Sequence, residues 1–331
     1  MALCVPVRVL LLGGLLLTCP GANSWDLRSV GIDKFHVRHV SLYRNRAFLT
    51  IESAASNVSL VEASWPENLP GYNHRARVLS DDGDESCQAL QRVLCTDVDR
   101  LARLWVLSGP NGHCPPKLLI RSLLGPQAGE IQHRFQRSDR HFQTLVVDPV
   151  PAADGDTRAF ITLHDHDYIL LYSLFKRSLG MLKFEKNDLS TLHPISLSEV
   201  TVNHNRLYVA DTVSDRLFAL PVRNLRQMAF PEDGIHRIVM KTSITYLGQL
   251  LGRPHGLKLD CHDNLLYVLP RDGAIVLWSA GQALKAENHR VVFQQSGHIA
   301  QIILGVAGKA WAVSADYVSP ATRRHCVKLV L

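Results

Sequence analysis

Residues 159–172, AFITLHDHDYILLY, hold the pattern that decides the fold: an apolar strand-like run, a short polar turn and a second apolar run. The start of this pattern, a small or aliphatic residue followed by an aromatic and then β-forming residues, returns five more times along the chain. Polar turns rich in Asp, Ser and Gly follow several copies, as expected where a chain reverses between strands. The aromatics of the six copies are separated by 57, 55, 48, 59 and 44 residues: Phe48, Trp105, Phe160, Tyr208, Tyr267 and Trp311.

A repeat of about fifty residues with several strands in each unit is typical of a β-propeller. One four-stranded sheet cannot bury both of its faces, whereas sheets stacked around an axis cover each other and enclose the aromatics between them. The long amphipathic helices that alternate with strands in α/β folds are missing from the sequence. We therefore expect an all-β, six-bladed β-propeller that forms a single domain over residues 25–331.

The composition favours a globular protein and argues against several functions. Of the 331 residues 46% are hydrophobic and 20% are charged, which excludes a disordered or fibrous chain. The net charge of +6 is spread along the sequence without a basic cluster, so we expect no nucleic-acid partner. The sequence contains no glycine-rich nucleotide motif and no G-x-S-x-G nucleophile elbow, so we expect no cofactor.

The first 24 residues read as a signal peptide. Arg8 precedes an apolar core at Val9–Leu17, and Ala22-Asn23-Ser24 offers small side chains to a signal peptidase, which predicts cleavage before Trp25. The alternative is a buried N-terminal helix or strand. Nine apolar residues cannot span about 30 Å of hydrocarbon. We expect a secreted, extracellular protein without a membrane-spanning segment.

Cysteines and one glycosylation sequon agree with secretion. No C-x-x-C pair occurs, which argues against structural zinc. The simplest arrangement in an oxidising compartment is two disulfides and one free thiol. Asn57-Val58-Ser59 is the only N-x-[ST] sequon, and we expect Asn57 to be glycosylated. After removal of the signal peptide five cysteines remain: Cys87, Cys95, Cys114, Cys261 and Cys326.

Several blocks between residues 87 and 280 resemble the yellow / major royal jelly protein family of insects. The resemblance implies a secreted six-bladed propeller, as the repeat does. At four positions where the family usually carries Asp, Asp, Cys and Asn, this chain carries Ser108, Leu163, Leu101 and Ser279. The blocks that carry the resemblance are RLWVL at 103–107, CPPKLL at 114–119, AFIT at 159–162, LLY at 170–172 and Ala274-Ile275 with Trp278.

The resemblance also bears on the disulfides. The usual family partner of Cys114 falls at Leu101, so Cys114 must pair elsewhere. Cys87 lies where the family places another cysteine, and Cys95 could approach Cys114 across a hairpin, so both remain candidates. We further expect Cys261 to bond Cys326 and join the last strand to its neighbour.

Two motifs suggest metal sites, each with a plainer alternative. In His164-Asp165-His166-Asp167, alternation along a strand would put both His164 and His166 on one face, with a spacing suited to a metal. The plainer interpretation is a solvated hairpin turn. Residues 254–260, PHGLKLD, resemble the entry strand of calcium-dependent lactonase-type propellers, but such a segment is also an ordinary start of a strand.

Polar groups at the ends of propeller strands face the axial channel, where small ligands usually bind. By this argument Asn205, Asp211, His255 and Trp278 are candidate ligand-binding residues. An aromatic and an acid together would suit a small amine through cation–π contact and charge pairing. The alternative for Trp278 is packing between sheets.

The sequence thus predicts an extracellular binding or structural factor, rather than an enzyme, linked to cuticle, pigmentation or secretion. A small amine or catechol is the expected ligand. The family resemblance offers a second hypothesis, an isomerase of the dopachrome-conversion type, which needs only a positioned acid and base. A third hypothesis is a calcium-dependent, lactonase-like hydrolase. The oligomeric state cannot be inferred from the sequence.

Overall fold

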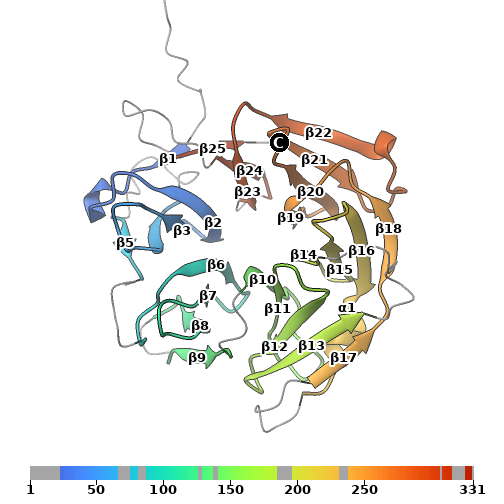
Figure 1. Ribbon diagram of the computed structural model, residues 1–331, viewed down its shortest axis with the longest axis horizontal. Coiled ribbons are helices and arrows are strands. Elements are labelled where there is room, and N and C mark those ends of the chain that lie inside the picture. The colour runs from blue at the N-terminus through green and yellow to red at the C-terminus, as the bar shows by residue number, and fades with distance from the viewer. Residues whose placement is uncertain are drawn as a thin grey trace, which may run out of the picture.

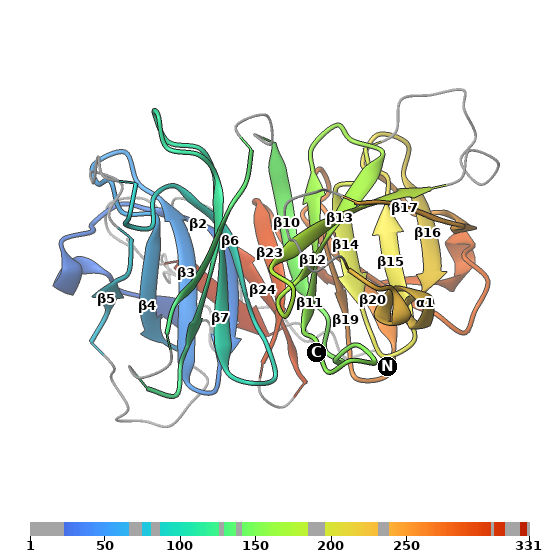
Figure 2. The same cartoon turned by 90° about the horizontal axis from the view of Figure 1, so that it is seen from below.

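The fold is an all-β propeller, as the repeat predicts: the strands of the computed structural model surround one axis in separate sheets (Figures 1 and 2). The described strands are distributed over six hydrogen-bonded sheets, numbered here 1 to 6 along the chain. No helix in this described part is long and apolar enough to cross a membrane. The structure describes residues 23–65, 75–80, 87–125, 129–136, 141–184, 196–230, 238–305, 308–314 and 325–329.

Each sheet places its first strand next to the axis and its later strands progressively outward (Figure 1). Sheet 1 comprises β2 (His36–Tyr43), β3 (Arg46–Glu52), β4 (Leu60–Ser64) and β5 (Arg77–Val78). Sheet 2 comprises β6 (Val93–Val98), β7 (Arg103–Ser108), β8 (Lys117–Ser122) and β9 (Ile131–Arg134). Sheet 3 comprises β10 (Phe142–Val147), β11 (Arg158–Leu163), β12 (Tyr168–Ser173), β13 (Ser178–Phe184) and β17 (Ile238–Thr242).

The second half of the chain repeats this arrangement. Sheet 4 comprises β14 (Glu199–Val202), β15 (Arg206–Ala210), β16 (Arg216–Pro221) and β18 (Thr245–Gln249). Sheet 5 comprises β19 (His255–Leu259), β20 (Asn264–Leu269), β21 (Ala274–Ser279) and β22 (His289–Gln294). Sheet 6 comprises β23 (Ile299–Leu304), β24 (Ala310–Ser314), β25 (His325–Leu329) and β1 (Asn23–Trp25). The described helices are short: α1 (Val222–Gln227) and the 3-10 turns Arg28–Val30 and Ala286–Asn288.

The six repeated aromatics lie in equivalent places, on the second strand of each sheet, and all are buried. They fill the space between neighbouring sheets. Phe48 of sheet 1 packs with Leu104 and Val106 of sheet 2, and Trp105 of sheet 2 meets Tyr172 of sheet 3 edge-on with ring centroids 6.0 Å apart. The aromatic repeat in the sequence is therefore the repeat of the core.

Asp residues form several of the tight turns. Asp165, Asp215 and Asp263 adopt positive φ angles of 59°, 60° and 61°. Asp tolerates this left-handed conformation better than most residues other than glycine and asparagine, because its short side chain can bond to the nearby backbone. This explains why the sequence repeatedly places Asp between two strand-like runs.

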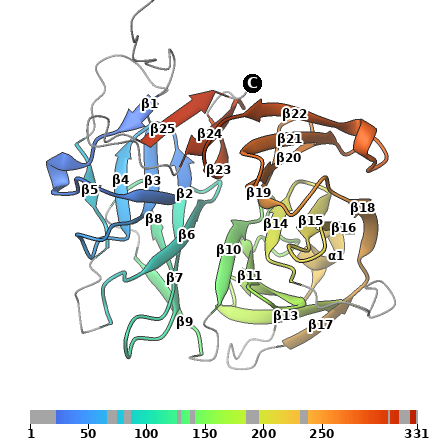
Figure 3. The same ribbon diagram turned by 45° about the horizontal axis from the view of Figure 1, so that its top comes forward.

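The ring is closed by segments from both ends of the described chain. The strand β1 pairs with β25, so that Asn23 lies opposite Val327 and Trp25 opposite His325 (Figure 3). The indole of Trp25 donates to the carbonyl of Ser64 at 3.0 Å. The cleavage site predicted before Trp25 falls inside β1, while residues 1–22 lie outside the described part.

One strand departs from the regular pattern. Instead of completing sheet 4 directly, the chain passes from β16 through α1 and adds β17 to the outer edge of sheet 3, parallel to β13. It then returns to sheet 4 as β18, which pairs antiparallel with β16. Sheet 3 consequently has five strands.

The disulfide prediction is confirmed for Cys114, which is bonded to Cys87 with 5.4 Å between the Cα atoms. Cys95, the competing partner, is a buried free thiol on β6. The expected Cys261–Cys326 bond is not formed, because Cys261 is free and exposed. Cys261 lies in the turn that follows the innermost strand of sheet 5, whereas Cys326 belongs to β25, two strands out from the axis in sheet 6.

Candidate functional site

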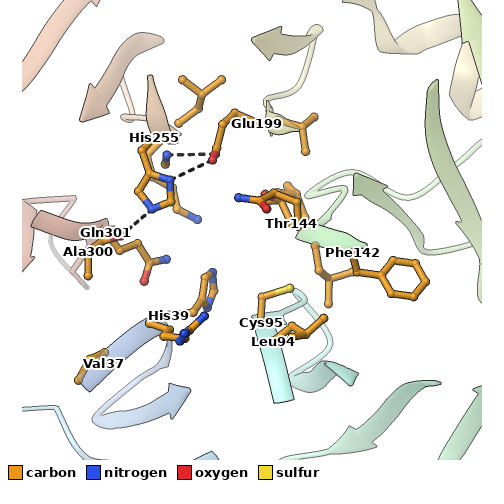
Figure 4. A pocket seen from close by; sticks show the side chains of 18 of the residues that line it. Val37, His39, Leu94, Cys95, Phe142, Thr144, Glu199, His255, Ala300 and Gln301 are labelled. Atoms are coloured by element: carbon orange, nitrogen blue, oxygen red, sulfur yellow. Dashed lines mark hydrogen bonds and ion pairs between the residues drawn. The ribbon is translucent and has the colours of Figure 1, made fainter. Parts of the chain in front are cut away.

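A central cavity of about 430 Å³ lies on the propeller axis, where the first strands of the sheets converge (Figure 4). Every sheet contributes to its wall, because the first strand of each runs beside the axis. Apolar side chains such as Val37 and Leu94 form part of the wall. The polar or reactive side chains that line it are those of His36, Arg38, His39, Cys95, Gln143, Thr144, Glu199, His255, Lys258, His298 and Gln301.

Glu199 and His255 form the strongest polar contact of the cavity. His255 Nδ1 lies 3.2 Å from a carboxylate oxygen of Glu199, and the other oxygen accepts the backbone N–H of Gly256 at 3.0 Å. His255 Nε2 lies 3.1 Å from the carbonyl oxygen of Ala300. Both imidazole nitrogens thus face acceptors, and the bond to Glu199 raises the pKa of His255. His255 is best described as an imidazolium that ties together β14, β19 and β23.

His39 lies on β2 and reaches into the same cavity (Figure 4). Burial lowers its pKa to about 3, and the nearby charges of Lys258 and His255 add to this effect. The backbone N–H of Thr96 points at His39 Nδ1 from 3.4 Å, so Nδ1 is the acceptor and Nε2 carries the proton. His39 is therefore a neutral imidazole with an N–H donor.

A second chamber of about 170 Å³ continues along the axis beyond His39 and Lys258, which line both spaces. Asp97 of β6 lies in its wall, and its two oxygens accept the backbone N–H groups of Val98 at 2.9 Å and Val147 at 2.7 Å. Burial raises the pKa of Asp97, while Lys258 and the two N–H donors oppose this shift. His39 and Lys258 thus mark the boundary between the two chambers.

Cys95 presents its thiol to the cavity (Figure 4). Burial raises the pKa of this thiol to about 12. The thiolate is the nucleophilic form of cysteine, and it is scarcely populated at neutral pH under these conditions. Cys95 therefore acts as a small apolar wall residue.

Of the four ligand-binding residues predicted from the sequence, His255 lines the cavity and the other three lie elsewhere. Asn205 is exposed in the turn beyond the far end of β14. Asp211 is fully buried, where it accepts the backbone N–H of Ser196 at 3.0 Å and pairs with Arg216 at 2.9 Å. Trp278 is buried between sheets and meets Tyr208 edge-on with ring centroids 6.5 Å apart. Its role is therefore packing, the alternative considered from the sequence.

The remaining predicted sites lie in loops. His164 is exposed in the turn between β11 and β12 and pairs with Asp165 at 3.5 Å, and His166 stacks on Tyr168 with centroids 4.9 Å apart. Asn57 is exposed in the loop between β3 and β4. Among the described residues, one group with metal-ligand spacing occurs, Cys87–His113–Cys114, and its two sulfurs are already joined as a disulfide.

The sequence analysis missed His39, Glu199 and Lys258. A signal for them exists in the aromatic repeat: each lies nine residues before the aromatic of its own sheet, which are Phe48, Tyr208 and Tyr267. The spacing is regular because the chain runs from the cavity along the first strand and through one tight turn before it reaches the aromatic on the second strand. In sheets 2 and 6 the lining residues Cys95 and Gln301 lie ten residues before the aromatic, and sheet 3 departs further because a longer loop joins β10 to β11.

Comparison with known proteins supports the family resemblance in the second half of the chain. Residues 176–317, less than half of the chain, match the family model described as Major royal jelly protein. The blocks from Cys87 to Tyr172 lie outside the match. The chain matches no curated protein sequence.

Solved structures show the same fold at low sequence identity. Virginiamycin B lyase from Staphylococcus aureus superposes with a TM-score of 0.53 at 10% identity, covering 93% of this chain and 87% of that chain. A luciferin-regenerating enzyme gives 0.53 at 12% identity, covering 94% and 96%. An auxiliary nutrient binding protein from Bacteroides thetaiotaomicron gives 0.56 at 8% identity, covering 89% and 69%. At such identities the likeness is one of fold.

Proposed function

We propose that this chain, whose residues 176–317 match the major royal jelly protein family, is a secreted six-bladed propeller that binds a small organic ligand in its central cavity. The observation that carries the proposal is the cavity itself, walled by the first strands of all the described sheets. Its volume of about 430 Å³ falls within the range of sites for small molecules.

The composition of the wall supports a ligand with an aromatic or otherwise apolar body and a few polar groups. Apolar side chains alternate there with separate hydrogen-bonding groups, as is usual in small-molecule sites. A catechol suits this wall better than a simple amine. Glu199, the one carboxylate among the lining residues described, is already engaged by His255 and Gly256.

Secretion is part of the same proposal. The Cys87–Cys114 disulfide is of the kind that persists in oxidising compartments. Asn57 is exposed and so accessible for glycosylation. An extracellular catechol-binding protein would fit a role in cuticle, pigmentation or secretion. Expression in eukaryotic cells should yield exported protein whose mass falls on treatment with a glycosidase, and Asn57→Gln should abolish that fall.

The binding proposal is tested by isothermal titration with 4-methylcatechol and related catechols. We expect saturable 1:1 binding without conversion of the ligand. Cys95→Met places extra atoms in the cavity and should weaken binding about tenfold or more, since an overpacked site excludes its ligand. Cys261→Met is the matched control, because Cys261 is exposed and lies outside the cavity. Absence of saturable binding, or equal effects of both variants, would reject the central site.

A second candidate function, an isomerase of the dopachrome-conversion type, is favoured by one specific observation. His39 and His255 line the same cavity with pKa values shifted in opposite directions, down and up. Groups separated in this way can serve as a base and an acid. Dopachrome consumption faster than the uncatalysed rate, and lost in both His39→Asn and His255→Asn, would favour this enzyme over a binding protein.

The calcium-dependent hydrolase is less well supported by the chemistry of the wall. Calcium takes six to eight oxygen ligands, most of them carboxylates or carbonyls. The described lining offers the Glu199 carboxylate, whose two oxygens are both occupied. The donor set therefore does not suit an axial calcium ion.

A further inference from the structure

We infer that the ligand of the central cavity carries an acidic group, a carboxylate or similar oxyanion, held by the ammonium group of Lys258 and the Nε2–H of His39. These two residues lie where the two chambers meet. The inference rests on the proposed function and deepens it, because it names the charge of the ligand. It excludes a simple amine as the preferred occupant.

Glu199 and Gln301, two of the acceptors that line the cavity, already hold hydrogen bonds. Both oxygens of Glu199 accept hydrogen bonds, from His255 and from the backbone of Gly256. Gln301 Oε1 accepts the backbone N–H of Val40 at 2.6 Å. A cationic ligand would have to share these acceptors with the bonds already made, or displace those bonds and leave buried groups unsatisfied.

Two donor groups of the same cavity are available to a ligand. Lys258 Nζ makes no hydrogen bond or ion pair with any residue of the described chain, although the side chain lines both chambers. His39 Nε2 carries a proton because Nδ1 accepts from Thr96, and the ring is enclosed and points into the cavity (Figure 4). Two N–H donors without partners in this part of the structure thus converge on one space.

The two cationic side chains differ in how their charges are balanced. The positive charge of His255 is balanced by Glu199 in direct contact. The ammonium of Lys258 makes no such direct contact with a described residue, and Asp97, which also lines the second chamber, acts on it without a hydrogen bond or ion pair. A charge in a space of low polarity is stabilised strongly by a directly bonded partner of opposite sign. An oxyanion placed between Lys258 and His39 would supply that partner.

The test uses three probes with the same ring: 3,4-dihydroxyphenylacetate, which is anionic, dopamine, which is cationic, and 4-methylcatechol, which is neutral. Isothermal titration of the full-length mature protein should show the acid binding about tenfold or more tightly than the amine, with the neutral compound between them. Lys258→Met keeps the length of the side chain and should abolish the preference. Lys258→Arg should retain it, and Lys285→Met, at an exposed position, should leave it unchanged.

The outcomes separate the inference from the function on which it rests. Tighter binding of dopamine, or equal affinity for all three probes, overturns the inference while the central binding site stands. Binding of none of the three contradicts the proposed function itself. Because the preference of the wild-type protein is decisive alone, the inference remains testable even if Lys258→Met fails to fold. A preference that survives in a folded Lys258→Met protein also overturns it.

Discussion

At the scale of single residues, two histidines of one cavity are held in opposite protonation states by their neighbours. His39 is enclosed by protein, which favours the neutral ring, while His255 bonds to a carboxylate, which favours the charged ring. The two states have opposite consequences for stability. They can be separated by measurements at different pH.

The first prediction concerns His39. Its pKa is about 3 in the folded protein and ordinarily near 6.5, so the unfolded chain takes up the proton first as the pH falls. The stability that neutral His39 contributes is therefore complete above pH 6.5 and is lost on acidification toward pH 3. His39→Asn keeps an acceptor for the Thr96 N–H. Between pH 6.5 and 5 its free energy of unfolding should fall by about 2 kcal/mol less than that of wild type. Urea unfolding at the two pH values measures this. An equal fall in the free energy of unfolding for the two proteins would contradict the prediction.

The second prediction concerns His255, where the sign is reversed. Its pKa is raised by Glu199, so this pair stabilises the fold fully below about pH 6.5, and the contribution is lost as the pH rises through the folded pKa. In Glu199→Gln the carboxylate is gone, and burial should bring the pKa of His255 below its wild-type value. Titration of the His255 ring protons by NMR measures this directly. An unchanged pKa would mean that the contact is absent in solution.

The third prediction concerns the Cys87–Cys114 disulfide. The bond joins positions 27 residues apart, so its loss in Cys114→Ser should lower the free energy of unfolding by about 3 kcal/mol. Cys261→Ser changes an exposed free thiol and should have an effect below about 0.5 kcal/mol. Peptide mapping of unreduced protein should recover Cys87 and Cys114 in one linked pair. A linked pair that contains Cys95 instead would contradict the structure.

At the scale of the strand, the second strand of each sheet holds the core together through its aromatic. Phe160 of β11 is 1% exposed and packs against sheet 4, whereas Phe175, in the turn after β12, is 70% exposed. Phe160→Ala should therefore cost about 3–5 kcal/mol of stability, and Phe175→Ala less than about 0.5 kcal/mol. Chemical denaturation of both variants provides the comparison. Similar losses would mean that the aromatic repeat does not mark the core.

At the scale of the whole molecule, the ring depends on contacts between its first and last sheets. Trp25 packs against Trp65 with centroids 6.0 Å apart, and Trp65 meets Trp311 of sheet 6 edge-on at 5.6 Å. Trp25→Ala should lower the free energy of unfolding by about 3–5 kcal/mol. In this variant, backbone hydrogen exchange should also accelerate more in β2 and β24, on the two sides of this contact, than in β11. Uniform acceleration in all the sheets would indicate that closure is not localised there.

The sequence is informative about the fold because at least three consecutive strands form the greater part of each sheet. The aromatic positions, the turns and the two candidate partners of Cys114 could all be predicted from residues that lie close together in the sequence. The cavity was harder to predict because its side chains come from strands some fifty residues apart. Their hydrogen bonds and protonation states arise only when the folded chain brings them together. His255 was predicted correctly because its motif is local. Trp278 and Asp211 were wrongly assigned to the channel: Trp278 packs between sheets, and Asp211 is held by hydrogen bonds in a turn. The parallel strand β17 has no local signal, since its partner β13 lies more than fifty residues earlier.

The detour of the chain through β17 has a consequence for the order in which the protein assembles during synthesis. Sheet 3 acquires its outer strand only after all of β14, β15 and β16 have been made, and sheet 4 acquires β18 immediately afterwards. These two sheets are thus interlocked and must mature together, while their neighbours can form one at a time. A ribosome stalled with β16 just emerged would carry two incomplete sheets with open edges, which is the stage at which a chaperone would have most to protect.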